Sequence, residues 1–343
     1  MLSAIHAFCV APMLDWTDRH CRVFHRAISR RACLYTEMIT TGAILHGGPG
    51  RFLAHDDTGP VALQLGGSEP DDLAVCARLA EVWGYDEVNL NCGCPSERVQ
   101  RGAFGACLMR EPRLVADCVA AMRDACDIPV TVKHRIGLGR DESHAFVRDF
   151  VGTVAEAGCG LFIVHARNAW LEGLSPKENR EIPPLRHEVV HALRRDFPSL
   201  RFVLNGGLQS HSQAMEAVSD PDTGRPALAG AMVGRQAYHD PWMLADVDAT
   251  WYGESTDSVP SRRDVVERMI THADAQARQG VPLRAIVRHM LGLYQGQPGA
   301  RAWRRTLSDA SLLRGADSGL LRRAMEEVEA AGERMSLREP CPG

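Results

Sequence analysis

The first residue of this sequence that could do chemistry is a cysteine in a polar, glycine-rich loop. Cys94 lies in the segment NLNCGCPSERVQRGAFGACLM, whereas structural cysteines usually occur in apolar, buried segments. A thiol in such a loop can donate a proton, act as a nucleophile or bind a metal ion. The short spacing to Cys92 is poor for a zinc site, which makes metal binding the weakest of the three. Gly102 and Gly105 predict mobility that would let the cysteine close over a substrate.

Three further polar residues each follow or interrupt a run of apolar residues. Lys133 ends VTVK, His165 ends FIVH, and Gln64 lies in VALQLGG. A lysine in this position can contact a phosphate or a ring, form a Schiff base, or lie at the surface. The histidine is interpreted as a site residue rather than a core histidine, and the glutamine amide suits either a pyrimidine-like ring edge or the capping of a turn. Because His134 and Arg135 follow Lys133, positive surroundings favour a role at the anionic edge of a reduced flavin.

Two glycine-containing turns follow the last two apolar runs. Asn205, Gly206 and Gly207 come first, and Gly234 and Arg235 come second. Glycine leaves the backbone N–H groups open to a ligand, and barrels commonly hold a phosphate after these strands. An isolated NGG is more often only a tight turn. Paired with the glycine and arginine of the next turn, it predicts a phosphate-binding site.

All these residues fall at the ends of short β-rich runs that alternate with helical segments. Near-continuous apolar strands that alternate with helices predict a parallel sheet covered by helices. Eight such units fit a closed TIM (β/α)8 barrel, an α/β fold, better than an open sheet, and no GxGxxG follows the first run. In a barrel, the residues that follow the strands meet on one rim. The predicted strands are residues 7–11, 33–37, 61–65, 87–91, 130–134, 161–165, 201–205 and 229–233.

The β pattern stops near residue 242. Helical spacing continues over residues 262–279, 283–293, 302–307 and 320–333, and the sequence GQPG interrupts it because glycine and proline break helices. The sequence therefore predicts a TIM-barrel catalytic domain at residues 1–245. A small C-terminal all-helical domain is predicted at residues 246–343.

Composition narrows the class of protein. The 343 residues are 45% hydrophobic and 24% charged, which is ordinary for a globular protein. No apolar run approaches the ~20 residues of a membrane helix, and the N-terminus does not resemble a secretory signal. The cysteines number eleven, an odd count, and form no CxxC pair. This pattern favours free thiols and a cytoplasmic location.

The charge of the chain is unevenly distributed. A net charge of −4 argues against general binding of polyanions. Between Arg284 and Arg314, however, six arginines accompany a single acid, Asp309. This segment is the best candidate for a local contact with nucleic acid. An amphipathic helix with solvated arginines would show the same pattern.

Several motifs together resemble the tRNA-dihydrouridine synthase family. The resemblance covers nearly the whole chain in the right order, and NCGCPS within a flavin barrel is its most specific part. The segment RHMLGLYQGQPGARAWRR, residues 288–305, is similar to the A subfamily in particular. The other motifs are APMLDWTDRHCR (11–22), LQLGG (63–67), NLNCGCPS (89–96), VKHRIG (132–137), HAR (165–167), SPKENR (175–180), NGG (205–207) and VGR (233–235).

The resemblance implies a flavoprotein that binds tRNA. Family membership implies tightly but non-covalently bound FMN, NADPH as the reductant, tRNA as the substrate, no metal, no DNA and no membrane, with a monomer sufficient. It implies Cys94 as the general acid and Asn91 as a contact to the target uridine. By motif, the FMN contacts are Pro12, Met13, Leu14, Gln64, Lys133, His165, Asn205, Gly206, Gly207, Gly234 and Arg235. The implied tRNA contacts are Lys177, Arg180, Arg301 and Arg304.

The implied reaction is the reduction of uridine to 5,6-dihydrouridine in the D-loop, at positions 20 and 20a. The C5=C6 bond of uracil is electron-poor, so hydride from flavin N5 adds at C6 and Cys94 delivers a proton to C5. The base must leave its stack, which costs a few kcal/mol. Recognition of tRNA shape and phosphates by the basic helix offsets that cost.

Some residues depart from the family pattern. Asn168 stands where a lysine is more usual, which predicts the loss of one phosphate or tRNA contact. Arg186 and His187 also differ from the expected residues. A stretch at 220–229 lengthens the connection before the last strand and is predicted to be a surface loop.

Three other functions fit parts of the pattern. A dehydrogenase of the dihydropyrimidine or dihydroorotate type would share the flavin contacts but would not need SPKENR or the arginine-rich helices. A non-catalytic RNA-binding barrel would not need Cys94, Lys133 and His165 together. A Schiff-base aldolase acting through Lys133 would leave Gln64 and the glycine turns with fewer roles.

Overall fold

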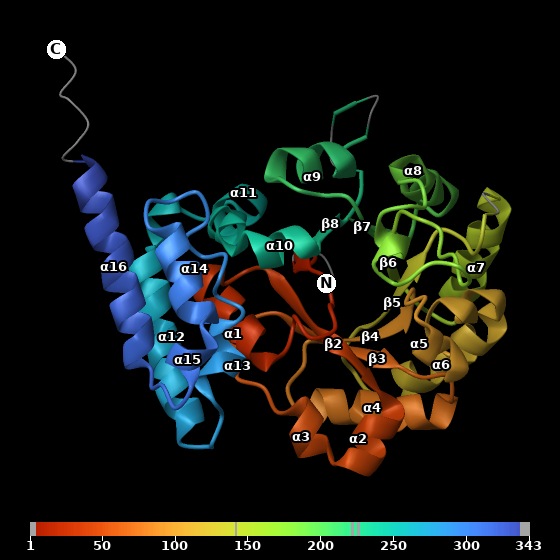
Figure 1. Ribbon diagram of the computed structural model, residues 1–343. Helices are drawn as coiled ribbons and strands as arrows, with labels where there is room; N and C mark the ends of the chain where they lie inside the picture. The colour runs from red at the N-terminus through yellow and green to blue at the C-terminus, as the bar shows by residue number, and fades with distance from the viewer. Residues whose placement is uncertain (1–4, 141–142, 221–222, 225–226, 337–343) are drawn as a thin grey trace. The chain divides into compact units, whose positions relative to one another are not determined.

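Eight parallel strands close into a barrel in sequence order (Figure 1). The computed structural model describes residues 5–140, 143–220, 223–224 and 227–336. The predicted TIM barrel is confirmed, and each predicted strand lies within a few residues of its position. The strands are β1 (Phe8–Val10), β2 (Cys33–Thr40), β3 (Val61–Gly66), β4 (Glu87–Cys92), β5 (Val130–Arg135), β6 (Leu161–His165), β7 (Arg201–Asn205) and β8 (Gly230–Val233).

The strands are buried on both faces. Apolar side chains such as Cys9, Ile163, Val203 and Met232 fill one end of the barrel interior, and outward-facing residues pack under the helices. Burial on both faces explains why the strands read as near-continuous apolar runs rather than alternating ones. The exceptions are polar residues at alternate positions of β4 and β5, and these build the site described below.

Helices connect consecutive strands of the barrel. Pro70 and Pro112 begin the two helices α4 and α6, where proline costs no intrahelical hydrogen bond. Helices α4, α6 and α7 pack on one another in that order. The helices of this part are α2 (Thr41–Gly47), α3 (Pro49–Leu53), α4 (Pro70–Val82), α5 (Glu97–Arg101), η1 (Gly105–Arg110), α6 (Pro112–Ala125), α7 (His144–Glu156), η2 (Glu178–Arg180), α8 (His187–Asp196) and α9 (His211–Val218).

The contacts divide the chain into two compact units. The barrel unit comprises Met1–Asp15 and Ala32–Gly234, and the helical unit comprises Trp16–Arg31 and Arg235–Gly343. The first helix, α1 (Arg19–Ile28), therefore groups with the C-terminal helices although it lies between β1 and β2 in the sequence. The contacts divide the chain after Gly234. The functional domain boundary at residue 245 stays a prediction.

The C-terminal part is helical, as expected from its sequence. One helix differs from the prediction: residues 283–293 form a helix only to Val287. Beyond it the chain continues in turns, and at Gly292 it packs so closely on the carbonyl oxygen of His239 that no side chain would fit. The helices are α10 (Arg235–His239), η3 (Pro241–Asp246), α11 (Val247–Tyr252), η4 (Thr256–Ser258), α12 (Arg262–Ala277), α13 (Leu283–Val287), α14 (Ala300–Ser308), α15 (Ala310–Leu313) and α16 (Gly319–Ser336).

Asp18 ties α1 to the C-terminal helices. Its carboxylate accepts the backbone N–H groups of His20 and Cys21 at 3.0 Å each, which caps α1. It also accepts a hydrogen bond from Arg288 at 2.7 Å and one from His289 at 3.0 Å. Burial alone would raise the pKa of Asp18, but these hydrogen bonds and the charge of His289 hold it well below its ordinary value. One carboxylate thus joins residues that are 270 positions apart.

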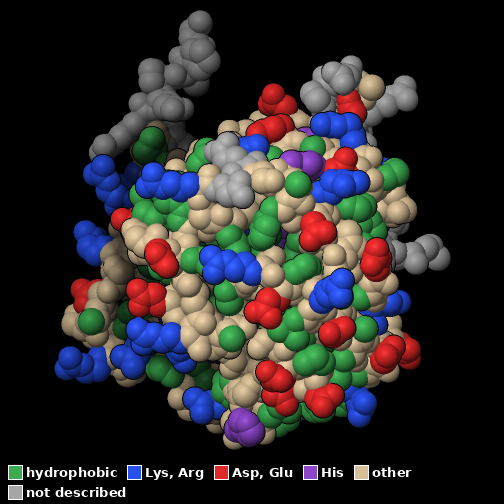
Figure 2. All heavy atoms as spheres, turned by 90° about the vertical axis from the view of Figure 1, so that its right-hand side faces the viewer, with side chains coloured by type: hydrophobic (Ala, Val, Ile, Leu, Met, Phe, Trp, Pro, Cys, Tyr) green, Lys and Arg blue, Asp and Glu red, His purple; other side chains and the backbone are tan. Residues whose placement is uncertain are grey.

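Acidic and basic side chains are mixed on the surface. On the face shown in Figure 2, Lys and Arg are interspersed with Asp and Glu. A mixed surface agrees with the small net charge of the chain. Nucleic-acid contact on this face would therefore have to rest on particular residues rather than on an extended basic patch. Among the residues that the structure describes, no helix combines the length and apolar character needed to span a bilayer.

Candidate functional site

The candidate site lies where β3 to β8 end. In the barrel, Asn91 on β4 lies opposite Lys133 on β5, and Arg135 on β5 lies opposite His165 on β6. His165 in turn lies opposite Asn205 on β7. The strand register therefore brings together residues that are more than 100 positions apart, as the barrel prediction requires.

The loop that carries Cys94 is held by the side chain of Asn91. The amide oxygen of Asn91 accepts the backbone N–H groups of Gly93 and Cys94, both at 3.0 Å. The carbonyl oxygen of Cys94 accepts the N–H of Ala106 at 2.9 Å. Gly105 has a φ of +76°, and a side chain there would lie 2.7 Å from the Cys94 carbonyl oxygen. This glycine therefore permits a close approach of two backbone segments, a role that does not depend on mobility.

A chain of buried side chains fixes the orientation of the Asn91 amide. Asn91 donates to Gln64 at 2.8 Å, Gln64 donates to Asn89 at 2.8 Å, and Asn89 donates to Thr131 at 2.8 Å. The Thr131 hydroxyl then donates to the carboxylate of Glu87 at 2.6 Å. Every donor in this chain points toward Glu87, so the amide oxygens point toward the Cys94 loop.

Glu87 is fully buried at the lower end of this chain. It also accepts a hydrogen bond from Tyr35 at 2.8 Å and pairs with His6 at 2.5 Å. Burial disfavours the charged form of His6, but the hydrogen bond and charge of Glu87 outweigh it and raise the pKa of the imidazole. The buried carboxylate is thus fully hydrogen-bonded, as a charge inside a protein must be.

Basic groups gather on the neighbouring strands β5 and β6. Lys133 donates to the side-chain oxygen of Asn205 at 3.0 Å, and burial lowers its pKa to about 7, with Arg135 adding to the effect. Burial also lowers the pKa of Arg135 to about 9. The pKa of His165 lies well below its ordinary value because of burial and the neighbouring cations. Depressed pKa values on three neighbouring bases mark a place that suits an anionic ligand.

His134 does not contribute to this positive cluster. Its ring packs between Phe150 and Phe162, with ring centroids 5.2 and 5.7 Å away, on the opposite side of β5 from Lys133. Burial lowers its pKa to about 4. The expectation that His134 adds to the positive surroundings of Lys133 is therefore wrong, because successive residues of a strand point to opposite faces.

Arg135 joins two loops of the site. Its guanidinium donates to the carbonyl oxygen of Gly93 at 3.1 Å, next to Cys94. It also donates to the carbonyl oxygens of Asn168 at 3.3 Å and Asn179 at 3.0 Å, in the long loop after β6. Arg135 is only 3% exposed. It therefore acts as a buried cross-link between the loop of Cys94 and the loop of SPKENR.

The two glycine turns differ in conformation. Gly206 and Gly207 have φ values of +118° and +75°, which favour glycine. His187 contacts the carbonyl oxygen of Gly206 at 2.9 Å and so supports this turn. Gly234 lies close to Ala11 and Met13, since a side chain there would come within 3.7 and 3.9 Å of them. Arg235 begins α10, which the contacts assign to the helical unit.

The segment after β1 carries the other predicted FMN contacts. Pro12 and Met13 are half-buried, and Leu14 is 69% exposed. The backbone N–H of Asp15 donates to the carboxylate of Glu37, which fixes the end of the segment. Leu14 is thus an exposed apolar side chain beside the site, of the kind that a bound ring covers.

Among the predicted tRNA contacts, Lys177 and Arg180 are exposed residues of the loop after β6. The fully buried Asn179 between them organises this loop. Its side-chain oxygen accepts the backbone N–H of Trp170 at 2.8 Å, and its side-chain nitrogen donates to the backbone carbonyl oxygen of Trp170 at 2.9 Å. Arg180 lies near enough to depress the pKa values of Arg135 and His165.

Arg301 and Arg304 lie on α14 of the helical unit. This helix buries Trp303 and Leu307 and exposes both arginines. In the described part of the chain, neither arginine forms an ion pair. The arginines of the neighbouring helices differ, because Arg263 of α12 and Arg322 of α16 pair with glutamates.

The departures from the family pattern have structural roles. Asn168 is 5% exposed and donates to the carbonyl oxygen of Gly139 at 3.2 Å, so it anchors the loop after β5. Arg186 contacts Glu188 at 3.1 Å. The stretch at 220–229 includes residues 221–222 and 225–226, which lie outside the described residues.

Three residues of the site are not predicted from sequence: Glu87, Asn179 and His187. Arg135 is predicted only as part of the positive surroundings of Lys133, although two positions along a strand place both side chains on one face. The roles of Glu87, Asn179 and His187 depend on contacts made across the fold. No group of histidine, cysteine and acidic side chains in the described residues could hold a metal ion.

An eight-stranded barrel with a loop thiol and buried cations on its rim defines a ligand-binding TIM-barrel enzyme. The family model of dihydrouridine synthases matches residues 9–329. This chain belongs to the dihydrouridine synthase family, as its motifs suggest.

Close relatives cover nearly the whole chain. It is 54% identical to a tRNA-dihydrouridine(20/20a) synthase of Shewanella oneidensis, over 94% of each chain. It is 55% identical to proteins of the same name from Salmonella typhi, over 94% of this chain and 95% of the relative, and from Escherichia coli K12, over 94% and 91%. The resemblance to the A subfamily agrees with these names. A looser likeness to the solved structure of morphinone reductase, with a TM-score of 0.48 and 13% identity over 73% of this chain and 86% of that one, is too weak to support an inference.

Replacing Thr131 with valine tests the buried chain of hydrogen bonds. The substitution keeps the shape of the side chain but leaves the amide of Asn89 without its acceptor and removes one donor to Glu87. We expect the free energy of unfolding to fall by about 1–3 kcal/mol, measured by urea denaturation. Thr153→Val on α7, where the side chain is only half-buried, is the control. An equal loss in both variants would contradict the importance of the buried chain.

Proposed function

We propose that this protein reduces uridine to 5,6-dihydrouridine at positions 20 and 20a in the D-loop of tRNA, using FMN and NADPH. The observation that carries the proposal is the placement of Cys94. Its loop is pinned by Asn91, and the half-buried Lys133 and the buried Arg135 lie beside it. The proposal is supported by family membership and by the activity named for relatives that are 54–55% identical.

The residues at the rim fit FMN. Lys133 is a half-buried cation with no carboxylate among its strongest electrostatic neighbours, so an anionic partner would restore its ordinary charge. Gln64, Lys133 and His165 would hold the ring, with Pro12, Met13 and Leu14 along one side. Asn205, Gly206, Gly207, Gly234 and Arg235 would hold the phosphate end. When bound, the flavin supplies the hydride that adds to C6 of the uracil.

Cys94 is the residue that would complete the reaction. Addition at C6 leaves negative charge on C5 and the C4 carbonyl of the uracil, and C5 then takes the proton of the Cys94 thiol. The thiol proton moves to carbon and the cysteine is left as a thiolate, which solvent reprotonates. Asn91 would present the thiol at a fixed position through its two loop hydrogen bonds. Its remaining amide hydrogen is available for the uridine.

The two units would share the work of binding tRNA. We place the FMN-binding catalytic domain at residues 1–245 and the helical tRNA-binding domain at residues 246–343. Lys177 and Arg180 would contact the tRNA from the barrel, and Arg301 and Arg304 from α14. We further propose that the protein acts as a monomer in the cytoplasm, where its thiols stay reduced.

The proposed function is tested by separating flavin reduction from uridine reduction. Under anaerobic conditions NADPH should bleach the flavin absorbance, and unmodified tRNA, but not free uridine, should restore it. Cys94→Ala should keep its FMN and its reduction by NADPH but form dihydrouridine at least about a hundredfold more slowly, because general acid catalysis contributes about 10²–10⁴ in rate. Cys107→Ala, which alters another half-buried thiol, is the control. Near-normal turnover by Cys94→Ala would remove the cysteine from its role, and no flavin spectrum in the native protein would refute the function.

The role of α14 is tested by reversing its charge. Arg301→Glu combined with Arg304→Glu should weaken tRNA binding by at least about tenfold, because phosphate contacts dominate affinity for nucleic acids. The flavin content should not change. Arg278→Glu combined with Arg323→Glu makes the same change of charge at two other exposed arginines of this unit. Unaltered binding by the α14 variant, measured by fluorescence anisotropy at fixed salt, would contradict the assignment.

The lowered pKa of Lys133 predicts a pH dependence for cofactor binding. Without an anion beside it, Lys133 loses its proton near pH 7. The reduced ring of FMN is anionic at the edge that Lys133 would face and favours the charged lysine, so above pH 7 the anaerobic binding of reduced FMN to apoprotein must take up a proton. The affinity should therefore fall by up to about tenfold per pH unit between pH 7 and pH 9. In Lys133→Arg, whose side chain stays charged, the affinity should change little, and an equally flat profile in the native protein would contradict the prediction.

A further inference from the structure

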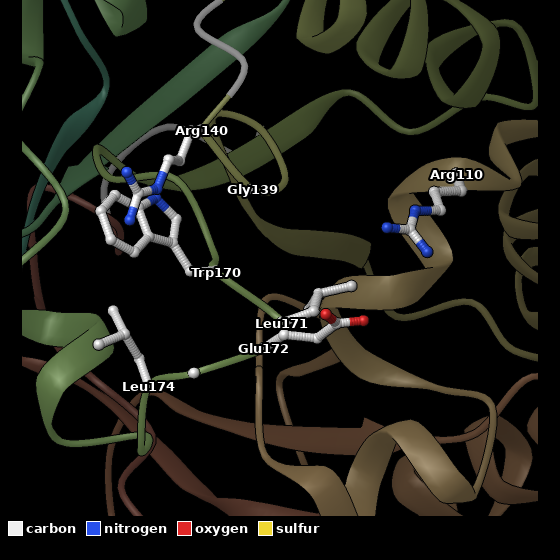
Figure 3. Close-up of a pocket in the computed structure, with 8 residues that line it drawn as sticks. Arg110, Gly139, Arg140, Trp170, Leu171, Glu172 and Leu174 are labelled. Carbon is white, nitrogen blue, oxygen red and sulfur yellow. The ribbon is translucent and has the colours of Figure 1, made fainter.

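A second pocket opens beside the Cys94 loop. It has a volume of about 370 Å³ and is lined by Arg110 of η1, Arg140 after β5 and residues 170–174 after β6. Figure 3 shows the guanidinium of Arg140 over the indole of Trp170, with Arg110 across the pocket from them. The distance from the guanidinium carbon of Arg140 to the ring centroid of Trp170 is 4.7 Å. The volume lies within the range of small-ligand sites.

The indole of Trp170 is held on a fixed backbone. The backbone N–H of Trp170 donates to the side-chain oxygen of Asn179 at 2.8 Å, and the backbone carbonyl oxygen of Trp170 accepts from the same amide at 2.9 Å. Asn179 is fully buried. A rigid backbone presents a half-exposed aromatic face without the entropic cost of ordering a loop. The pocket therefore has a fixed aromatic platform, which the exposed side chain of Arg140 covers in this structure.

Two side chains connect this pocket to the proposed catalytic loop. The amide of Gln100 donates to the carbonyl oxygens of Pro95 and Leu171, both at 2.9 Å. Arg135 donates to Gly93 on one side and to Asn179 on the other. The segment that contains Cys94 and the segment that contains Trp170 are thus bonded at two places. A ligand in the pocket would therefore lie next to a substrate bound at the Cys94 loop.

We propose that this pocket receives an unpaired nucleotide of the tRNA that neighbours the target uridine, an inference that rests on the proposed function. The base takes the place of the Arg140 guanidinium on the indole of Trp170, and the exposed side chain of Arg140 turns, with Arg110, to the phosphate. Single-stranded RNA is commonly bound in this way, by bases splayed onto aromatic faces and phosphates paired with arginine. Glu172 also lines the pocket and repels phosphate. Its carboxylate only accepts hydrogen bonds, so it is placed to accept one from an amino group of the base.

The experiment compares aromatic and non-aromatic residues at position 170. Trp170→Ala should weaken the binding of unmodified tRNA by about fivefold or more, because stacking on an aromatic side chain contributes about 1–3 kcal/mol per base. Trp170→Phe should recover most of the affinity. Arg140→Ala, at an exposed side chain, should also weaken binding, whereas Arg78→Ala on α4 should not. The KM for NADPH, the flavin content and the melting temperature should not change in any of them.

Each other outcome would overturn the inference. Unchanged tRNA binding in both Trp170→Ala and Arg140→Ala would show that no nucleotide uses the pocket. Equal losses in the alanine and phenylalanine variants would show that the position is structural. A higher KM for NADPH with unchanged tRNA binding would assign the pocket to the reductant. Failure of the native protein to form dihydrouridine would refute the proposed function itself, a result that these variants do not influence.

Discussion

The amide of Asn91 is the contact on which the rest of the site depends. A primary amide has a donor end and an acceptor end, and only one orientation lets its oxygen accept the N–H groups that position Cys94. The buried carboxylate of Glu87 fixes that orientation, because it can only accept hydrogen bonds. Gln64 and Asn89 therefore each donate toward Glu87 and accept from the side of Asn91. A negative charge at the bottom of the barrel therefore determines how the rim is arranged. The energetic requirement is that every member stays satisfied, since an unpaired polar group in this interior is costly.

The neighbouring strands β5 and β6 follow a different electrostatic logic. The buried Arg135 lies with the half-buried Lys133 and His165, and the charged form of each is disfavoured in the protein alone. Gathering these groups destabilises the folded protein, because removing cations from water is costly. The arrangement is consistent with a site whose electrostatics are completed by an anionic ligand. The same reasoning applies to α14, whose arginines make no ion pair within the described residues while their neighbours on α12 and α16 do.

Much of this could be predicted from sequence, for reasons that particular residues make clear. Strands of a closed barrel are apolar on both faces, so the polar residues at and after their ends stand out, and this contrast is what singles out Cys94, Lys133 and His165 as candidates. Glu87 stands at the start of a strand, and nothing local indicates that its partners come from β2 and β5. The grouping of α1 with the C-terminal helices depends on Asp18 meeting Arg288, a contact that no local pattern announces. Charge counted along the chain places His134 beside Lys133, but successive residues of a strand point to opposite faces, so His134 lies away from the site.

The two neighbouring cations of β5 divide their roles according to their chemistry. Burial leaves Arg135 with a pKa of about 9, so it keeps its charge at neutral pH and can act as a permanent cross-link between two loops. Its planar guanidinium reaches three backbone carbonyl oxygens, which the single ammonium of a lysine could not do in that geometry. Lys133, with a pKa of about 7, is poised between its two states. It can therefore respond to charge placed beside it, and this explains why the residue nearer the Asn205 turn is a lysine and the residue that holds the loops is an arginine.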